Sequence, residues 1–246
     1  KKFMSMQLSL AQYELLTASY HGGYTHANRY YVNQLITEPV ECYDFTSSYP
    51  ARIVYEKLPI TNFVSTKLSL QDIMELKENY AFAGYIRLKK LRLKKGHPMP
   101  PLAFHKAKVC TFPDADADKI SKKKAMELNL DNGKIVNADL VIYPFTDPDL
   151  QVIFEAYDFE WADVANVIRA KKDYLPDWII NYVIELFEHK NTLKHADPVL
   201  YMISKGELNG IYGMMVQKMI QSMFEEDYET GLWNDVLSES EYEEKL

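Results

Sequence analysis

The hydrophobic pattern of this 246-residue chain changes its period, and that change constrains the fold more than any other feature. Residues 80–150 carry short apolar runs and alternations that are typical of β-strands. From Pro176 onward the apolar residues recur at helical spacing, and Asp197-Pro198 predicts the start of a second helix. Two helices joined by a short polar turn form an antiparallel hairpin. We therefore expect an α+β fold with a strand-rich region followed by a helical hairpin.

The first part of the chain predicts a helix, a glycine turn, a strand and a second helix. Residues 8–18 are expected to form a short amphipathic helix that stops at Tyr20-His21-Gly22-Gly23, where paired glycines indicate a turn or the close approach of another backbone. A strand is expected around Glu38 to Tyr43. The serines after it suit a helix cap, and Pro50 suits the first position of a short helix.

The negative charge is concentrated at the carboxyl end. The whole chain has a net charge of −7, but residues 225–246 hold nine carboxylates and one lysine, so the first 224 residues have a net charge of +1. The acidic composition of the whole chain therefore does not argue against a polyanionic partner.

Several classes of protein are disfavoured by what the sequence lacks. Its apolar runs are far shorter than the roughly 18–20 residues that span a bilayer, and no apolar signal segment follows Lys1, so a soluble intracellular protein is expected. Cys42 and Cys110 form no disulfide framework or zinc motif. The stretch 114–118 begins like a calcium loop but lacks its glycine and glutamate, so no calcium site is expected.

Residues 86–94 alternate between aliphatic and basic side chains, and the alternation slips by one at Lys89-Lys90. A β-bulge at that point would keep the basic side chains on one face of the strand. This face is either a candidate nucleic-acid surface or simply a solvated edge strand protected by lysine, and the sequence leaves both open. The basic residues are Arg87, Lys89, Arg92 and Lys94.

Two short segments carry side chains suited to chemistry. In residues 42–50, Asp44 follows the expected strand and precedes a turn; it could hold a divalent cation beside a phosphate, or merely cap the turn. In residues 205–213, Lys205, Asn209 and Tyr212 fall on one helical stripe that suits a nucleotide, although a solvated lysine and a core tyrosine would give the same pattern. Gly210 and Gly213 each cost about 1 kcal/mol in a helix, which indicates that something must come close to them.

In order, these segments resemble signature motifs of the family-B DNA polymerases, specifically the protein-primed group of phages and linear plasmids. Residues 44–50 are similar to motif A, DxxSLYP, with Ser48 in place of the usual leucine. Residues 205–213 are similar to motif B, KxxxNSxYG, with Gly210 in place of the usual serine. The YxGG signature is matched by Tyr20, Gly22 and Gly23.

The resemblance implies roles for individual residues. Asp44 and the Phe45 carbonyl would be Mg²⁺ ligands, and Asp44 would be the catalytic carboxylate. Tyr49 would stack under the incoming sugar and reject a ribose 2′-OH, while Lys205 would contact the triphosphate. A second lysine is expected on the preceding helix, where Lys190 and Lys194 both fit. The remaining candidates for nucleotide binding are Ser47, Ser48, Asn209 and Tyr212, and those for DNA binding are Tyr20, Gly22, Gly23 and Gly213.

The implied reaction is addition of a dNTP to a primer 3′-OH by two-metal phosphoryl transfer, in the cytoplasm of a bacterial host. The implied partners are primer-template DNA, dNTP and a terminal protein. No segment resembles motif C, which supplies the other metal aspartate, or the exonuclease motifs. We therefore expect a polymerase fragment that is inactive by itself.

The resemblance also divides the chain into four parts. We expect a first part of the palm, an insertion that resembles the terminal-protein-binding region, a fingers subdomain and an acidic segment that leads back toward the palm, at residues 1–56, 57–175, 176–216 and 217–246. The competing hypothesis is a non-catalytic module, left from a prophage, that binds DNA or a terminal protein through residues 87–94.

Overall fold

The computed structural model describes residues 8–25, 27–28, 31–113, 121–215, 224–226 and 233–235. The chain divides into two compact units. Residues 11–40 and 61–171 form one, here called the sheet unit, and residues 1–10, 41–60 and 172–246 form the other, here called the helical unit. No helix in the described part of the chain is both long and apolar enough to cross a membrane.

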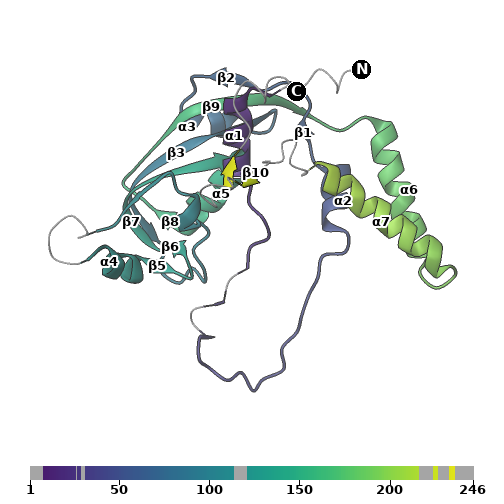
Figure 1. Cartoon of the computed structure of the whole chain (residues 1–246), viewed down its shortest axis with the longest axis horizontal. Coiled ribbons are helices and arrows are strands. Elements are labelled where there is room, and N and C mark those ends of the chain that lie inside the picture. Colours follow the sequence, from purple (N-terminus) through teal and green to yellow (C-terminus); the bar gives the residue numbers. More distant parts are fainter. Residues whose placement is uncertain are drawn as a thin grey trace. The chain divides into compact units, whose positions relative to one another are not determined.

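An antiparallel sheet of seven strands organises the sheet unit (Figure 1). Its main path runs in the order β1-β9-β3-β7-β4, while β2 pairs with β9 and β8 pairs with β3. The strands are β1 (Leu58–Pro59), β2 (Val64–Thr66), β3 (Tyr80–Leu93), β4 (Val109–Thr111), β7 (Asn137–Thr146), β8 (Tyr157–Asp158) and β9 (Trp161–Asp173). The short strand β1 pairs only with Lys172 and Asp173 of β9, and this pair belongs to the helical unit.

Smaller elements complete the structure. The sheet unit also holds α1 (Leu10–Ser19), α3 (Leu70–Leu76), the 3₁₀ turn η3 (Phe104–Lys106), α4 (Lys122–Asn129), α5 (Asp147–Ala156) and the β5–β6 hairpin (Leu130–Asp131 and Lys134–Ile135). The helical unit holds α2 (Ser48–Tyr55), α6 (Asp177–Leu193), α7 (Pro198–Met215) and the paired strands β10 (Phe224–Glu226) and β11 (Trp233–Asp235).

The core of the sheet unit lies on one face of β3 and β7. Ile86, Leu88 and Leu91 of β3 are fully buried there with Val141 and Phe145 of β7. Burying a side chain of this size contributes about 1.5–3 kcal/mol, so this face supplies much of the stability of the unit. Helix α5 covers part of the same core with Leu150, Ile153 and Ala156.

The alternation in β3 slips at Lys89-Lys90, as predicted, but the predicted β-bulge there is wrong. Leu88 and Leu91 are both buried, yet the pairing of β3 with β7 continues through this point without a shift of register. The slip arises instead because Lys90 adopts a left-handed backbone conformation with φ of 54°. A left-handed residue turns the following side chains over without adding a residue to the strand.

The register shift in β3 lies closer to the start of the strand. Pairing with β9 shifts between Ala83 and Tyr85, opposite a segment in which Asn166 has φ of 51°. Gly84 sits at this bulge, where a Cβ atom would lie 3.1 Å from the Ala165 carbonyl oxygen and from the Phe145 ring. Glycine is therefore needed here for close packing between strands.

The helical unit is built on a hairpin of α6 and α7, as the sequence predicts (Figure 1). Val183 and Leu186 of α6, Leu208 of α7 and Ile53 of α2 are buried together in one cluster. The carboxylate of Asp197 accepts hydrogen bonds from the N–H groups of Val199 and Leu200, which stabilises the start of α7.

Two local predictions differ from the structure. The strand expected from Glu38 to Tyr43 is irregular, exposed backbone, because none of the residues that the structure describes pairs with it. Pro50 is the third residue of α2 and not the first. The helices expected at 8–18, after Pro50, after Pro176 and after Asp197 are present, and the candidate calcium loop at 114–118 lies outside the described residues.

Replacing Leu88 with alanine should destabilise the sheet unit by about 2–5 kcal/mol, because the substitution leaves a cavity in a fully buried site. Urea unfolding followed by circular dichroism would measure this loss. Leu128→Ala on α4 is the matched control: Leu128 is 63% exposed, so its change should stay within about 0.5 kcal/mol. Equal losses for both variants would contradict the assignment of Leu88 to the core.

Candidate nucleotide-binding site and nucleic-acid surface

The residues that resemble motif A lie at the start of α2. Asp44 and Phe45 are exposed in irregular backbone, followed by a turn at Thr46 and Ser47. Ser47 occupies the N-cap position with a left-handed backbone, φ 53° and ψ 46°, and its hydroxyl does not cap the helix. This conformation costs about 1–2 kcal/mol for a residue with a side chain. Backbone strain of this kind is common at functional sites.

The Ser47 hydroxyl is held by the other half of the helical unit. The Lys190 ammonium group on α6 donates a hydrogen bond of 2.6 Å to Ser47 Oγ, across 143 residues of sequence. The same ammonium lies 5.2 Å from the centre of the Phe187 ring. Of the two lysines that the sequence leaves as alternatives, Lys190 is thus the one in contact with the turn after Asp44, and Lys194 is exposed near the end of α6.

A second contact joins the two motif segments. The rings of Tyr49 on α2 and Tyr212 on α7 are stacked, with centroids 3.7 Å apart and an interplanar angle of 13°. A stacked aromatic pair contributes about 0.5–1.5 kcal/mol beyond its buried area. The phenol of each tyrosine is therefore positioned beside the other motif.

The stripe predicted on α7 is a real feature of the helix. Lys205 and Asn209 are exposed, while Ser204 and Leu208 are buried on the other side. Lys205 Nζ lies 5.9 Å from the centre of the Tyr201 ring. A Cβ atom added at Gly206, Gly210 or Gly213 would meet nothing within 4 Å. Among the residues that the structure describes, none fills the space beside these glycines.

The metal donors around Asp44 are incomplete. Within the parts of the chain that the structure describes, no three His, Cys, Asp or Glu side chains lie close enough to hold a metal ion. One carboxylate and one backbone carbonyl, from Asp44 and Phe45, are hard oxygen donors of the kind that Mg²⁺ prefers. They fit part of a magnesium site, and further ligands are needed to complete it.

The residues that resemble the YxGG signature lie in the sheet unit, directly after α1. Lys106 on η3 fixes this segment, because its ammonium donates hydrogen bonds to the carbonyl oxygens of Ala18, at 3.3 Å, and of Tyr20. Tyr20 is exposed, and a Cβ atom at Gly22 or Gly23 would meet nothing within 4 Å. The backbone of the two glycines is thus accessible to a ligand.

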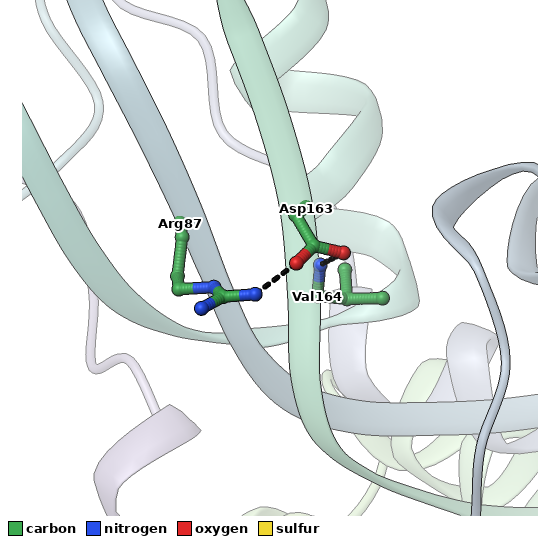
Figure 2. A network of polar contacts seen from close by, with 3 residues as sticks. All are labelled: Arg87, Asp163 and Val164. Atoms are coloured by element: carbon green, nitrogen blue, oxygen red, sulfur yellow. Dashed lines mark hydrogen bonds and ion pairs between the residues drawn. The ribbon is translucent and has the colours of Figure 1, made fainter.

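The four basic residues singled out from the sequence, three on β3 and Lys94 directly after it, differ in how far they are engaged. Arg87 forms an ion pair with Asp163 on β9, whose second carboxylate oxygen accepts a hydrogen bond from the Val164 N–H (Figure 2). Lys94 donates a hydrogen bond of 2.7 Å to the Phe154 carbonyl oxygen. Two of the four side chains therefore already have partners within the sheet unit.

The other two of these residues, Lys89 and Arg92, are exposed. Lys89 Nζ lies 5.2 Å from the centre of the Trp161 ring, which is also 5.6 Å from the Arg87 guanidinium carbon. Arg92 follows beyond the slip in the strand. An exposed aromatic ring beside cations is a common feature of nucleic-acid-binding surfaces.

Comparison with known proteins identifies the family. The model of DNA polymerase type B, organellar and viral, matches residues 1–143. The chain belongs to this family. No curated protein sequence matches it.

Solved structures of phi29 DNA polymerase share the fold. The complex with primer-template DNA and incoming nucleotide has a TM-score of 0.59 at 16% identity, over 94% of this chain and 36% of that one. The orthorhombic crystal form and the binary complex with primer-template DNA each have a TM-score of 0.59 at 16% identity, over 90% of this chain. This chain spans about a third of the length of phi29 polymerase.

The resemblance to family-B DNA polymerases is thereby confirmed, and the fold is shared with part of phi29 DNA polymerase. Sequence reasoning did not single out His21, Lys134 or Asp149, which line a pocket with Gly22 and Gly23 in the sheet unit. The position of His21 beside Gly22 and Gly23 was a sequence signal that could have pointed to this pocket. The lysine and aspartate come from distant elements, and no local pattern connects them.

Proposed function

We propose that this chain supplies the motif A and motif B residues of a DNA-dependent DNA polymerase used in protein-primed replication of a phage or mobile element. The contact between Lys190 and Ser47 carries the proposal, since it joins the motif A turn to the helical hairpin whose second helix carries motif B. The stacking of Tyr49 on Tyr212 supports the same pairing.

The proposed reaction is attack of a primer 3′-OH on the α-phosphate of a dNTP, with pyrophosphate as the leaving group. Bound Mg²⁺ ions would supply charge stabilisation for the attacking and leaving oxygens. Asp44 and the Phe45 carbonyl would be metal ligands, and Lys190 and Lys205 would neutralise the triphosphate. Tyr49 would lie against the sugar and exclude a 2′-OH. Ser47, Ser48, Asn209 and Tyr212 would line the nucleotide.

We further propose the division into palm, insertion, fingers and acidic segment at residues 1–56, 57–175, 176–216 and 217–246. In this division most of the sheet unit is the insertion, with basic strand β3 as a surface for DNA or a terminal protein. Tyr20, Gly22, Gly23 and Gly213 would contact DNA. Because motif C has no counterpart in the sequence, the 246-residue chain by itself should not extend primers.

A non-catalytic binding module is the second candidate function. The exposed Lys89 and Arg92 on β3 favour it, because such a surface can bind DNA without any nucleotide site. The two candidates differ in whether the motif A and motif B residues bind dNTP.

In a version of the polymerase that also contains motif C, Asp44→Ala should reduce nucleotide incorporation by at least about 10³-fold while DNA affinity changes little, since the carboxylate would bind metal and not DNA. Primer extension and DNA-binding assays would measure the two effects. Extension by Asp44→Ala at the wild-type rate would overturn the metal assignment.

Lys190→Gln should weaken binding of a fluorescent dNTP about 10-fold or more, because a hydrogen bond to a charged phosphate contributes about 1.5–3 kcal/mol. Lys194→Gln on the same helix removes the same charge without a contact to Ser47 and serves as the matched control, with an expected change below about twofold. Equal effects of the two variants would contradict a specific role for Lys190.

Replacing Arg87, Lys89, Arg92 and Lys94 together with glutamine should weaken duplex DNA binding and flatten its salt dependence, by about 0.9 in slope for each phosphate that is no longer neutralised. The double variant Lys89→Gln/Arg92→Gln should retain most of that effect, since these two side chains are exposed. Lys123→Gln/Lys124→Gln on α4 is the control for the double variant, with equal charge. An unchanged slope in the quadruple variant would favour a basic face that is merely solvated. The edge-strand interpretation itself is wrong, because β3 pairs with both β7 and β9.

A further inference from the structure

A pocket of about 360 Å³ opens beside the glycine turn of the sheet unit, and none of the motif A or motif B residues lines it. Its volume lies in the range of small-ligand sites. The turn contributes His21, Gly22, Gly23 and Tyr24, and the opposite walls come from residues 101–106, the β5–β6 hairpin, β7 and α5. All of these belong to the same unit.

The charged side chains that line the pocket are mainly basic. They are Lys106 of η3 and Lys134 of β6, with the imidazoles of His21 and His105, against the single carboxylate of Asp149. Lys134 Nζ lies 4.7 Å from the centre of the Tyr24 ring, and the Tyr24 hydroxyl donates a 2.7 Å hydrogen bond to the Pro100 carbonyl. The lysine and the ring together form a cationic and aromatic wall.

Asp149 is already engaged. Its Oδ2 accepts hydrogen bonds of 2.7 Å from both the N–H and the hydroxyl of Thr146, at the start of α5. This carboxylate therefore acts as a helix cap and is a weak partner for the pocket cations. The pocket retains an excess of positive charge that an anion could neutralise.

The His21 side chain lies in the pocket among these charged groups. Its ring is parallel to the Tyr143 ring, with centroids 5.8 Å apart and an interplanar angle of 3°. Tyr143 is fixed, since it is buried and its hydroxyl accepts a hydrogen bond from the Ala103 N–H. Burial lowers the pKa of His21, Lys106, Lys134 and His105 lower it further, and Asp149 opposes them. Without a bound anion, the surroundings of His21 thus favour its neutral form.

The geometry points to a phosphate-binding pocket for a nucleotide unit, in which His21 takes up a proton when the phosphate enters. The two glycines leave their backbone open to the phosphate, while Lys106 and Lys134 provide fixed positive charge. The aromatic ring of Tyr24 is available to the attached base or sugar. The proposal rests on the proposed function, which already takes Gly22 and Gly23 as DNA contacts, and it adds the basic pocket beside them and the proton uptake of His21.

The sign of the pH effect follows from linkage. The pKa of His21 is below its ordinary value in the free protein, and an adjacent phosphate would raise it. Affinity should therefore increase as the pH falls through the raised pKa and level off below the lowered one. A permanently charged lysine in this position would give no such dependence.

The test is binding of a fluorescent twelve-nucleotide oligo(dT) to the 246-residue chain in buffers free of phosphate, at pH 8.0 and pH 5.5. We expect wild-type affinity to rise about fivefold or more at the lower pH, with proton uptake seen by calorimetry in buffers of different ionisation enthalpy. His21→Gln should lose most of both effects. His97→Gln, a half-buried histidine of the same unit outside the pocket, should retain them.

Lys134→Gln is the second variant, and it should weaken binding at both pH values and reduce the salt slope by about 0.7, the value for one phosphate of a single strand. Competition by dTMP would show that a phosphate monoester suffices, whereas pH-dependent oligonucleotide binding without such competition would assign the site to a strand. A pH-independent affinity, or unchanged pH dependence in His21→Gln, would overturn the proposal. Primer extension by Asp44→Ala and dNTP binding by Lys190→Gln test the proposed function separately, so its failure can be distinguished from the failure of this proposal.

Discussion

The pairing of β3 on both edges is the constraint on which the sheet unit depends. A strand that is paired on both sides and buried on one face must satisfy its backbone hydrogen bonds and keep its apolar side chains on the core face. Leu88 and Leu91 are three residues apart, so a regular strand would place one of them in solvent. The left-handed Lys90 resolves this conflict while the pairing with β7 stays in register. The ion-pair partner of Lys90, Asp139 at 2.5 Å, lies on β7, where the burial pattern slips at the same level.

A different principle organises the helical unit. Motif A has little structure of its own, because Asp44 and Phe45 are exposed and no strand forms before them. The turn gains its position from the hairpin, through the Lys190 hydrogen bond to Ser47 and the stack of Tyr212 on Tyr49. Both contacts use polar or aromatic groups at the surface of a small apolar cluster centred on Val183 and Leu186. Geometry at this site therefore depends on the hairpin more than on local propensity.

Local sequence patterns predicted the helices well. The features that were not predicted depend on contacts between segments that are distant in the sequence. The spacing of apolar residues after Pro176 and the Asp197-Pro198 signal were sufficient to find both helices of the hairpin. The strand at 38–43 failed because β propensity describes a half-buried surface, and no described partner covers this segment. The choice between Lys190 and Lys194 also needed the structure, because only the packing of α6 against α2 decides which ammonium reaches Ser47. The motif resemblance identified the family without any of these details, since it rests on residue types and their order.

The residue at the centre of the glycine turn illustrates why a histidine suits a basic pocket. Lys106 is needed to hold the carbonyl oxygens of Ala18 and Tyr20, and Asp149 is needed to cap α5, so neither can be adjusted freely to balance charge. A third permanent cation at position 21 would face Lys106 and Lys134 without a free carboxylate, which would destabilise the protein in the absence of an anion. An imidazole avoids this cost because it is neutral in the free protein and can gain charge when an anion arrives. The stacking of its ring on the fixed Tyr143 keeps it in place in both states.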